Sequence, residues 1–499
     1  MGGSAVPPGT ASGQPDYTTC KGYGARLCLP HPANSTSSRA RDGDRAGRLR
    51  LRVASAGPLE RRWDNLQLTY AVALRVVPCS TGRGEEMSVD TMTAPRSLAP
   101  ELLLDPAVID EPYGFYRLLV KEAPVWRVPG SDIVVVSSFS AVSDAVGRTE
   151  EFSSNLMALL YRRNDGTPAT YPFDIGVQTL ATADPPAHSV HRKAVFPELV
   201  ARRMAMLRGE IAQLASLRLD HALQRAPIEA MDDIANAIPI RVVSKLIGFE
   251  GADPDALLSA AFASTAMLAA TEPLEVLLAS MATTTDVVSW IGDQLQAALD
   301  GKEVEGILAV VASAVRSGEL EVDEGIVIMA TLLSAGGEST TSLLGNALHI
   351  LAADPHLQSR LRADHDLVKP FIEEALRLES PFRHHLRHAA VATELSGVPI
   401  PAGATMLLLW SAANRDSAEF DRPDEVVLDR PAPRHHLGFG RGIHLCVGAP
   451  LARLEAEVIL TQVLQRTKHF KLDPDHSPAR VNSLMVRRFK SLPLMADLA

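Results

Sequence analysis

The sequence predicts a mainly α-helical fold with a small β region. Apolar residues recur at helical spacing over two long stretches, 322–353 and 449–460. Two short apolar runs, 133–138 and 406–410, are instead typical of strands in a small sheet. No internal repeat interrupts this order of signals, which indicates one folded body.

Composition limits the class of protein. Charged residues make up 22% and hydrophobic residues 46% of the 499 residues, as in soluble globular proteins. The net charge of −10 argues against nucleic acid as a general partner. We find no uninterrupted apolar run of membrane-spanning length and no secretory signal at the start. We therefore expect no membrane span and a cytoplasmic location.

Residues 1–86 differ from the rest of the chain. They are rich in Gly, Pro, Ser and Arg, above all in 39–52, and show no sustained periodicity. Such a composition is typical of disorder. We expect 1–86 to be a disordered N-terminal extension, with Met87 as an alternative start, and 87–499 to form the folded domain.

The folded part begins with a helical pattern at 111–119, and the strand 133–138 follows. The helix 322–353 would be roughly 48 Å long at about 1.5 Å per residue, enough to cross a whole domain. Gly336 and Gly337 lie in its middle, where each costs about 1 kcal/mol relative to alanine. Close approach of a flat ligand would explain them.

A further helix, 371–379, carries Glu374 and Arg377. Residues three apart share a helix face, so this carboxylate and this guanidinium can pair. Taken alone, such a pair is usually solvated on a helix surface.

The segment 436–448 contains Cys446, the one cysteine of the predicted folded domain. The glycines around it allow a tight turn and the close approach of another group. Because an apolar helical run begins at Ala449, we expect Cys446 at a helix N-terminus, where the dipole and free N–H groups favour a thiolate. A thiolate is the form that binds metals.

Two other interpretations of this glycine-rich segment fail on context. A dinucleotide fingerprint needs a preceding strand and a βαβ unit, whereas an irregular stretch precedes these glycines. A zinc site needs more thiols or histidines at regular spacing, and Cys446 has no cysteine nearby.

The complete pattern, Phe439-Gly-x-Gly-x-His444-x-Cys446-x-Gly448, resembles the haem-binding loop of cytochrome P450 enzymes. The paired helix and the long helix occur in that family's order, so the resemblance covers most of the chain. It implies the cytochrome P450 fold, haem b as cofactor and Cys446 as the axial iron ligand. His444 would contact a haem propionate, Phe439 would shield the sulfur, and Gly448 would complete the haem-binding loop.

The resemblance also implies roles for residues elsewhere. His188 and Arg192, one turn apart, match a pair that binds the haem propionates, and Arg387 matches an arginine that binds them from a strand. A buried carboxylate needs such partners, because an unpaired buried charge is costly. The pair of Glu374 and Arg377 matches residues that stabilise the fold and retain haem rather than act in catalysis.

Part of the long helix matches the oxygen-activation site of the family, where an acid and an alcohol relay protons. Glu338 matches the acid. Ser339 replaces the usual threonine and Thr340 follows it, so either hydroxyl can be the relay alcohol. A buried polar cluster that only kinks the helix is the alternative.

The substrate pocket is predicted to be apolar, because the segments that match substrate contacts are mainly apolar. His384, His385 and His388 lie where the family lines the substrate channel, so they are predicted to be exposed or pocket-lining rather than to bind a metal. The matching segments are 161–177, 333–335, 382–386 and 483–485.

Within the superfamily, the motifs are most similar to soluble actinobacterial, mycobacterial-type enzymes. This similarity implies monooxygenation of an apolar small molecule by O2. Electrons would come from a ferredoxin and a ferredoxin reductase, since the chain contains no flavin or iron–sulfur motif. Arg441 and Arg453 would offer positive charge to this partner. A peroxygenase or coupling enzyme, and a non-catalytic haem-binding sensor, are the alternatives.

Overall fold

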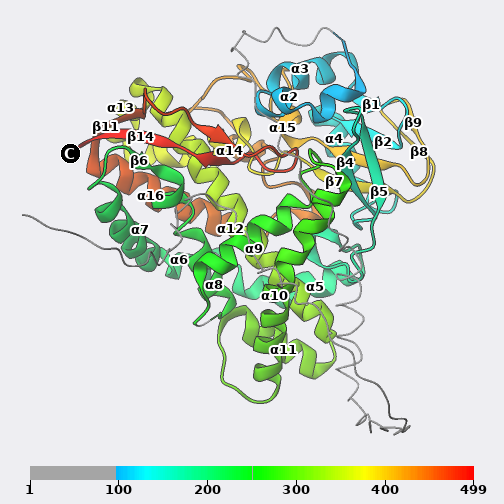
Figure 1. The fold of residues 1–499 in the computed structure, drawn as a ribbon, viewed down its shortest axis with the longest axis horizontal. Coiled ribbons are helices and arrows are strands. Elements are labelled where there is room, and N and C mark those ends of the chain that lie inside the picture. The colour runs from blue at the N-terminus through cyan, green and yellow to red at the C-terminus, as the bar shows by residue number, and fades with distance from the viewer. Residues whose placement is uncertain (1–96, 250) are drawn as a thin grey trace, which may run out of the picture. The chain divides into compact units, whose positions relative to one another are not determined.

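The computed structural model describes residues 97–249 and 251–499. The predicted extension 1–86, with Met87 and the other three cysteines, lies outside the described residues. The described part is mainly helical and contains small sheets, as predicted (Figure 1).

Helices form the larger share of the described chain. Their bounds are α2 (Pro106–Asp110), α3 (Tyr113–Glu122), α4 (Phe139–Gly147), α5 (Ala187–Val195), α6 (Ala201–Met206), α7 (Arg208–Ala222), α8 (Pro239–Ile247), α9 (Pro254–Ala266), α10 (Leu274–Leu299), α11 (Gly306–Ser317), α12 (Val322–Ala353), α13 (Pro355–Ala363), α14 (Val368–Leu378), α15 (Trp410–Ala413) and α16 (Ala449–Arg466).

The strands are short and belong to several small sheets. Their bounds are β1 (Val125–Arg127), β2 (Ile133–Val136), β3 (Phe152–Ser153), β4 (Ala158–Arg162), β5 (Pro168–Pro172), β6 (Ile228–Glu229), β7 (His385–Ala389), β8 (Thr393–Leu395), β9 (Val398–Ile400), β10 (Thr405–Leu408), β11 (Thr467–Leu472), β12 (Ala479–Arg480), β13 (Phe489–Ser491) and β14 (Pro493–Leu498).

The long helix α12 has the predicted bounds and joins two parts of the core. It begins with a capping box, in which the backbone N–H of Glu321 donates to the Glu324 carboxylate over 2.9 Å. Ile326 and Leu333 in its first half are buried among α8, α10 and α11. Leu344 in its second half is buried among α7, α14 and α16. Because each buried aliphatic side chain stabilises by about 1.5–3 kcal/mol, α12 is held along most of its length.

The largest sheet has the strand order β1-β2-β10-β7-β3. The central strand β10 pairs in parallel with β2, aligning Thr405 with Ile133, and antiparallel with β7, aligning Leu408 with His385. Both predicted strands are therefore present. Trp410 already lies in α15, so the second strand is shorter than predicted. This sheet carries β7 to the cavity described below.

One helix of the described residues, α10, is long and apolar enough to cross a membrane by length and composition alone. It packs against α9, α11 and α12. A single helix of this kind is weak support for a membrane span, since core helices of soluble proteins meet the same criterion. The expectation of no membrane span stays a prediction.

Candidate active site

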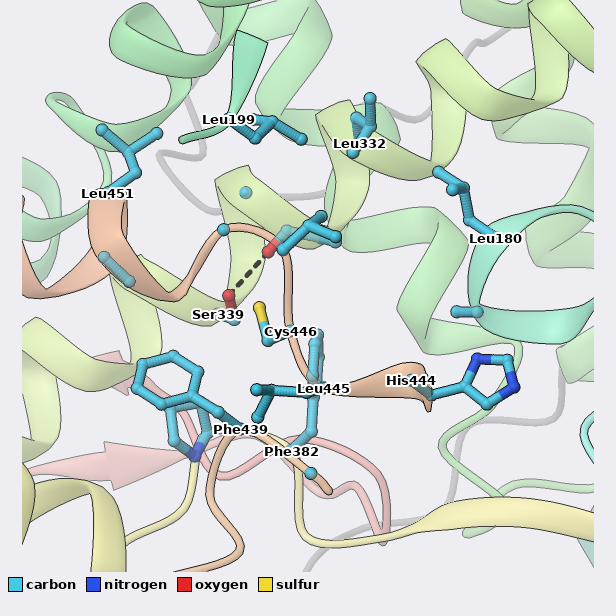
Figure 2. A pocket seen from close by; sticks show the side chains of 18 of the residues that line it. Leu180, Leu199, Leu332, Ser339, Phe382, Phe439, His444, Leu445, Cys446 and Leu451 are labelled. Atoms are coloured by element: carbon cyan, nitrogen blue, oxygen red, sulfur yellow. Dashed lines mark hydrogen bonds between the residues drawn. The ribbon is translucent and has the colours of Figure 1, made fainter. Parts of the chain in front are cut away.

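A large cavity lies where α12, β7 and the loop before α16 meet (Figure 2). It encloses about 1560 Å³, part of which is open to solvent. Its lining is largely apolar and includes Leu180, Leu199, Leu332, Phe382 and Leu451.

The loop before α16 places Cys446 in this cavity. Gly440 and Gly442 have φ values of +69° and +71°, which residues with a Cβ rarely adopt, so the turn depends on them. The backbone N–H of Cys446 donates to the Phe439 carbonyl over 2.9 Å. In Figure 2 the sulfur points toward Ser339 on α12, and the Phe439 ring lies to one side. The loop therefore presents a single thiol to the cavity.

Two opposing effects set the pKa of the Cys446 thiol. The Cys446 side chain is surrounded by protein, and the part of its surface that is accessible faces the cavity. Burial raises the pKa, whereas the backbone N–H groups of Gly448 and Ala449 and the charge of Arg192 lower it. The N–H groups at the helix terminus thus lower the pKa as expected, but burial outweighs them and the pKa is raised overall. A cationic ligand at the sulfur is needed to hold the negative charge.

Four basic side chains that line the cavity lie close together. His188 and Arg192 come from α5, Arg387 comes from β7, and His444 comes from the cysteine loop. The ring centroids of His188 and His444 are 4.3 Å apart. His444 Nε2 also lies 2.8 Å from the Ser154 hydroxyl. The fold thus brings together the four residues predicted to contact haem propionates.

The electrostatics of this cluster are unusual. Burial lowers the pKa of Arg387 to about 10. Burial, followed by the charge of Arg387, lowers the pKa of His444 to about 3. Within residues 97–249 and 251–499, neither Arg192 nor Arg387 forms an ion pair with a carboxylate. Buried cations without anions are costly, so the cluster fits a ligand that carries carboxylates.

Ser339 and Thr340 reach the cavity from α12. The Ser339 hydroxyl donates to the Ala335 carbonyl over 2.6 Å and faces Cys446 in Figure 2. Thr340 is buried and its hydroxyl lies beside the carboxyl group of Glu455 on α16. The two adjacent alcohols therefore have different partners, as expected for neighbouring helical positions about 100° apart.

Glu338 does not line the cavity. It is 1% exposed, and its carboxylate accepts hydrogen bonds from Arg488 Nε over 2.7 Å and from the Thr265 hydroxyl over 3.3 Å. Burial raises the pKa of Glu338, and the Arg488 charge opposes this rise. The structure thus separates the predicted acid from the hydroxyl of Ser339 and ties it to α9 and the C-terminal part of the chain.

The glycines in the middle of α12 lie against a neighbouring helix, and Gly336 also lines the cavity, where the predicted ligand could approach it. A Cβ added to Gly336 would lie 2.7 Å from Val243 on α8, and one added to Gly337 would lie 3.0 Å from Ile240 on the same helix. Close packing of α8 on α12 therefore requires glycine here, whatever ligand the cavity holds.

Glu374 and Arg377 form the predicted pair on α14, and it is buried rather than solvated. Each side chain is 1% exposed, and two hydrogen bonds of 2.9 Å join them. Arg430 adds hydrogen bonds of 2.9 and 3.2 Å to Glu374. Every charge in this group has a partner. Arg377 also donates to the carbonyl groups of Asn414, Pro423 and Glu425.

The predicted substrate segments contribute unequally to the cavity. Ala335 and Phe382 line it, in agreement with two of the four segments. The segment 161–177 contributes instead to the β4–β5 hairpin, and Leu484 in 483–485 is buried, its N–H donating to the Ala269 carbonyl. Neither of these two segments lines the cavity, because local pairing holds them elsewhere.

The three neighbouring histidines also differ. His385 lines the cavity, whereas His384 is 2% exposed and does not reach it. His388 lies on β7 but is not among the lining residues. The prediction of exposed or pocket-lining histidines is therefore confirmed for His385 and wrong for the buried His384, whereas His388 is half-buried outside the cavity.

Sequence reasoning missed many of the lining residues, and two of them, Trp410 and Glu455, carry polar groups into the cavity. The signal for Glu455 was present, since it is a carboxylate inside an apolar helical run. Burial holds its pKa well above its usual value, and its Oε1 has no hydrogen-bond partner in the described part of the chain. Trp410 had no signal beyond its position at the end of a strand.

The two arginines predicted to meet a redox partner are not equivalent. Arg453 donates to Glu373 over 2.7 and 2.9 Å, so its charge is compensated, and it stacks 4.5 Å from the Phe439 ring centroid. Arg441 is exposed and makes a neutral contact of 3.3 Å with Ser143. The positive charge offered to solvent comes from Arg441.

Comparisons with known proteins identify the class. The family model described as Cytochrome P450 matches residues 293–492. Cytochrome P450 144 of Mycobacterium tuberculosis is 40% identical over 390 residues, which cover 77% of this chain and 89% of that protein. Putative cytochrome P450 123 of the same species is 32% identical over 399 residues, covering 79% and 97%. The chain therefore belongs to the cytochrome P450 family, and its relatives are of the actinobacterial type.

Solved structures agree with this assignment. The ligand-free crystal structure of CYP164A2 from Mycobacterium smegmatis has a TM-score of 0.69 and is 29% identical, covering 79% of this chain and 100% of that one. The protein is a cytochrome P450 monooxygenase with haem b as its cofactor.

The residues of the cavity fit a haem. Cys446 aims a sulfur into it, and basic side chains without carboxylate partners line the same space. Haem has an iron that takes an axial thiolate and two carboxylates that need cations.

Proposed function

We propose that Cys446 is the thiolate ligand of the haem iron, and that His188, Arg192, Arg387 and His444 hold the haem carboxylates. The observation that carries this proposal is that the sulfur and these four side chains line one cavity. The haem carboxylates would compensate the buried cations of the cluster. The iron would stabilise the buried thiolate. Both costs of burial described above would then be removed.

We propose further that Phe439 and Gly448 shape the space around the sulfur. The Phe439 ring shields one side and is held by stacking with Arg453. The backbone N–H of Gly448 lowers the pKa of the Cys446 thiol. Gly448 would favour the thiolate, and Phe439 would cover the sulfur.

The proposed reaction is insertion of one oxygen atom of O2 into an apolar small molecule. When bound, the haem supplies the activation of dioxygen. Leu180, Leu332 and Phe382 support an apolar substrate, because they line the cavity that also holds Cys446. Electrons would come from a ferredoxin and a ferredoxin reductase in the cytoplasm, and the exposed charge of Arg441 supports docking of an acidic partner near the cysteine loop.

We propose Ser339 as the relay alcohol, because it is the hydroxyl that faces Cys446. It donates to the Ala335 carbonyl and keeps lone pairs with which to accept a proton. Glu338 can supply that proton only after its hydrogen bond to Arg488 opens. Thr340, next to Glu455, would hold a second, separate acid group in place.

We also propose that 87–499 is the complete haem domain. A chain that starts at Met87 is expected to bind haem as the full chain does, because the described core begins after that residue. Loss of haem from the purified shorter chain, measured as haem per protein, would contradict this.

The test of the function is a substrate screen by haem optical spectrum. Apolar compounds are expected to change the iron spin state, and charged compounds of similar size are not. Turnover with ferredoxin, reductase and NADPH should then consume O2 in proportion to product. Turnover with peroxide alone would favour the peroxygenase, and spectral binding without any turnover would favour the sensor.

A further inference from the structure

His385 reaches the cavity in an orientation that Trp410 restricts. The indole N–H of Trp410 lies 2.7 Å from His385 Nδ1. An indole nitrogen can only donate, so Nδ1 must be the acceptor. A neutral ring with an acceptor at Nδ1 carries its proton on Nε2.

The ring is neutral near pH 7. Burial, followed by the charge of Arg387, lowers the pKa of His385 to about 4. The edge contact with Phe382, at 5.8 Å between centroids, adds no charge. Among the residues that the structure describes, none accepts a hydrogen bond from Nε2. The accessible part of His385 faces the cavity, so its one N–H donor is available there.

The position on β7 shows what this donor can meet. Residues two apart on a strand point to the same face, so His385 and Arg387 lie side by side, about 7 Å apart along the strand. Both line the cavity. His385 also lies close enough to His444, a further member of the basic cluster, for a proton on His385 to lower the pKa of His444. The donor therefore lies beside the groups that lack carboxylate partners.

We propose that His385 donates its Nε2–H to a haem carboxylate next to Arg387, and that Trp410 acts as a positioning residue that fixes the tautomer. This inference rests on the haem orientation proposed above. It adds to the basic cluster a neutral donor, which contributes a directed hydrogen bond without another costly buried charge.

The experiment measures haem loss from the holoenzyme to excess apomyoglobin. His385→Phe is expected to lose haem about 10- to 100-fold faster, as for a lost hydrogen bond to a charged group. His385→Gln should restore most of the retention, because its amide N–H can replace Nε2–H. The matched control is His388→Phe, on the same strand but outside the cavity, which should lose haem at the unchanged rate.

A second measurement tests the tautomer. Nitrogen NMR of histidine-labelled, reduced, carbon monoxide-bound enzyme should show the His385 proton on Nε2, and Trp410→Phe should produce a mixture of tautomers. A proton on Nδ1 in the unchanged protein would overturn the inference. An unchanged rate of haem loss in His385→Phe would also overturn it. This holds as well if the variant weakens substrate binding alone.

Arg387→Leu separates this inference from the proposed haem orientation. If Arg387→Leu speeds haem loss and His385→Phe does not, the orientation stands and the inference about His385 fails. If neither variant speeds haem loss, the orientation itself is wrong.

Discussion

Two of the regions in which the protein buries arginine treat its charge in opposite ways. Around Arg377, each charge meets a carboxylate or carbonyl group of the same chain. Around Arg192 and Arg387, no carboxylate of the described chain forms an ion pair. The compensated charge of Arg377 stabilises the fold, whereas the uncompensated charges that line the cavity indicate a missing ligand. The comparison therefore separates structural residues from binding residues of the same type.

The largest effect is expected at the sulfur of the uncompensated region. Cys446→Ser should abolish the red-shifted carbon monoxide spectrum of the reduced enzyme, because Cys446 is the cysteine that lines the cavity. The measurement is the difference spectrum of the reduced protein, with circular dichroism as the control for folding. A normal spectrum from a folded variant would rule out the ligand assignment.

The next effect tests the compensated region. Arg377→Leu leaves Glu374 with one fewer cation and leaves several buried carbonyl groups without a donor, so we expect a loss of about 3–5 kcal/mol in the free energy of unfolding. Urea unfolding measures it. The control is Arg117→Leu, whose pair with Asp424 is exposed and should contribute at most about 1 kcal/mol.

Acid should reduce the stability that a second compensated group, the one around Glu379, gives to the fold. Burial alone would raise the pKa of Glu379, but Arg487, Arg480 and Arg415 outweigh burial and lower it from 4.5 to about 2. A carboxyl group whose pKa is lower in the folded than in the unfolded state stabilises the fold at pH values above its unfolded pKa. This stabilisation of about 3 kcal/mol should be lost as the pH falls from about 4.5 toward 2.

Urea unfolding at a series of pH values checks this prediction. Glu379→Gln should be less stable than the unchanged chain at pH 7, and its stability should depend less on pH in the acid range. An identical pH dependence in both proteins would show that Glu379 is not the titrating group.

Arg387→Leu should behave in the opposite way to Arg377→Leu. We expect haem loss to be at least about 10- to 100-fold faster, because a charge-assisted hydrogen bond to a carboxylate is removed. The haem-free protein should be as stable as before or more stable, because the variant removes an unpaired buried cation. A large fall in the stability of the haem-free variant would place Arg387 among the structural residues and break the comparison.

The smallest effect concerns the two alcohols of α12. Ser339→Ala should keep haem and substrate binding but release more peroxide per NADPH consumed, because the hydroxyl facing Cys446 is lost. Thr340→Ala should release less peroxide than Ser339→Ala, since its hydroxyl lies beside Glu455. Equal or reversed effects would move the role to Thr340 or to bound water.

Local patterns explain where the sequence was sufficient. The bounds of α12 follow from apolar spacing, and the contact of Glu374 with Arg377 follows from positions three apart on one helix. Both features depend on neighbours within a few turns. The cysteine loop was found because its glycines and Cys446 lie within one short segment.

Other expectations were wrong or incomplete because they depend on partners far along the chain. Gly336 accommodates Val243, Glu338 is held by Arg488, and the raised pKa of Cys446 reflects burial by the surrounding protein. None of these partners is close in sequence, so no periodicity could indicate them.

The sequence by itself determined the class of protein, the long helix and the thiol that faces the cavity, because each is carried by residue types at short, regular spacing. The tertiary structure alone decided which buried charges are compensated. Arg377 and Arg387 are the same type of residue in neighbouring segments. Arg377 forms an ion pair with Glu374, whereas Arg387 forms no ion pair with a carboxylate of the described chain. Desolvation and Coulomb attraction depend on distances through space, and these distances cannot be read from the order of residues along the chain.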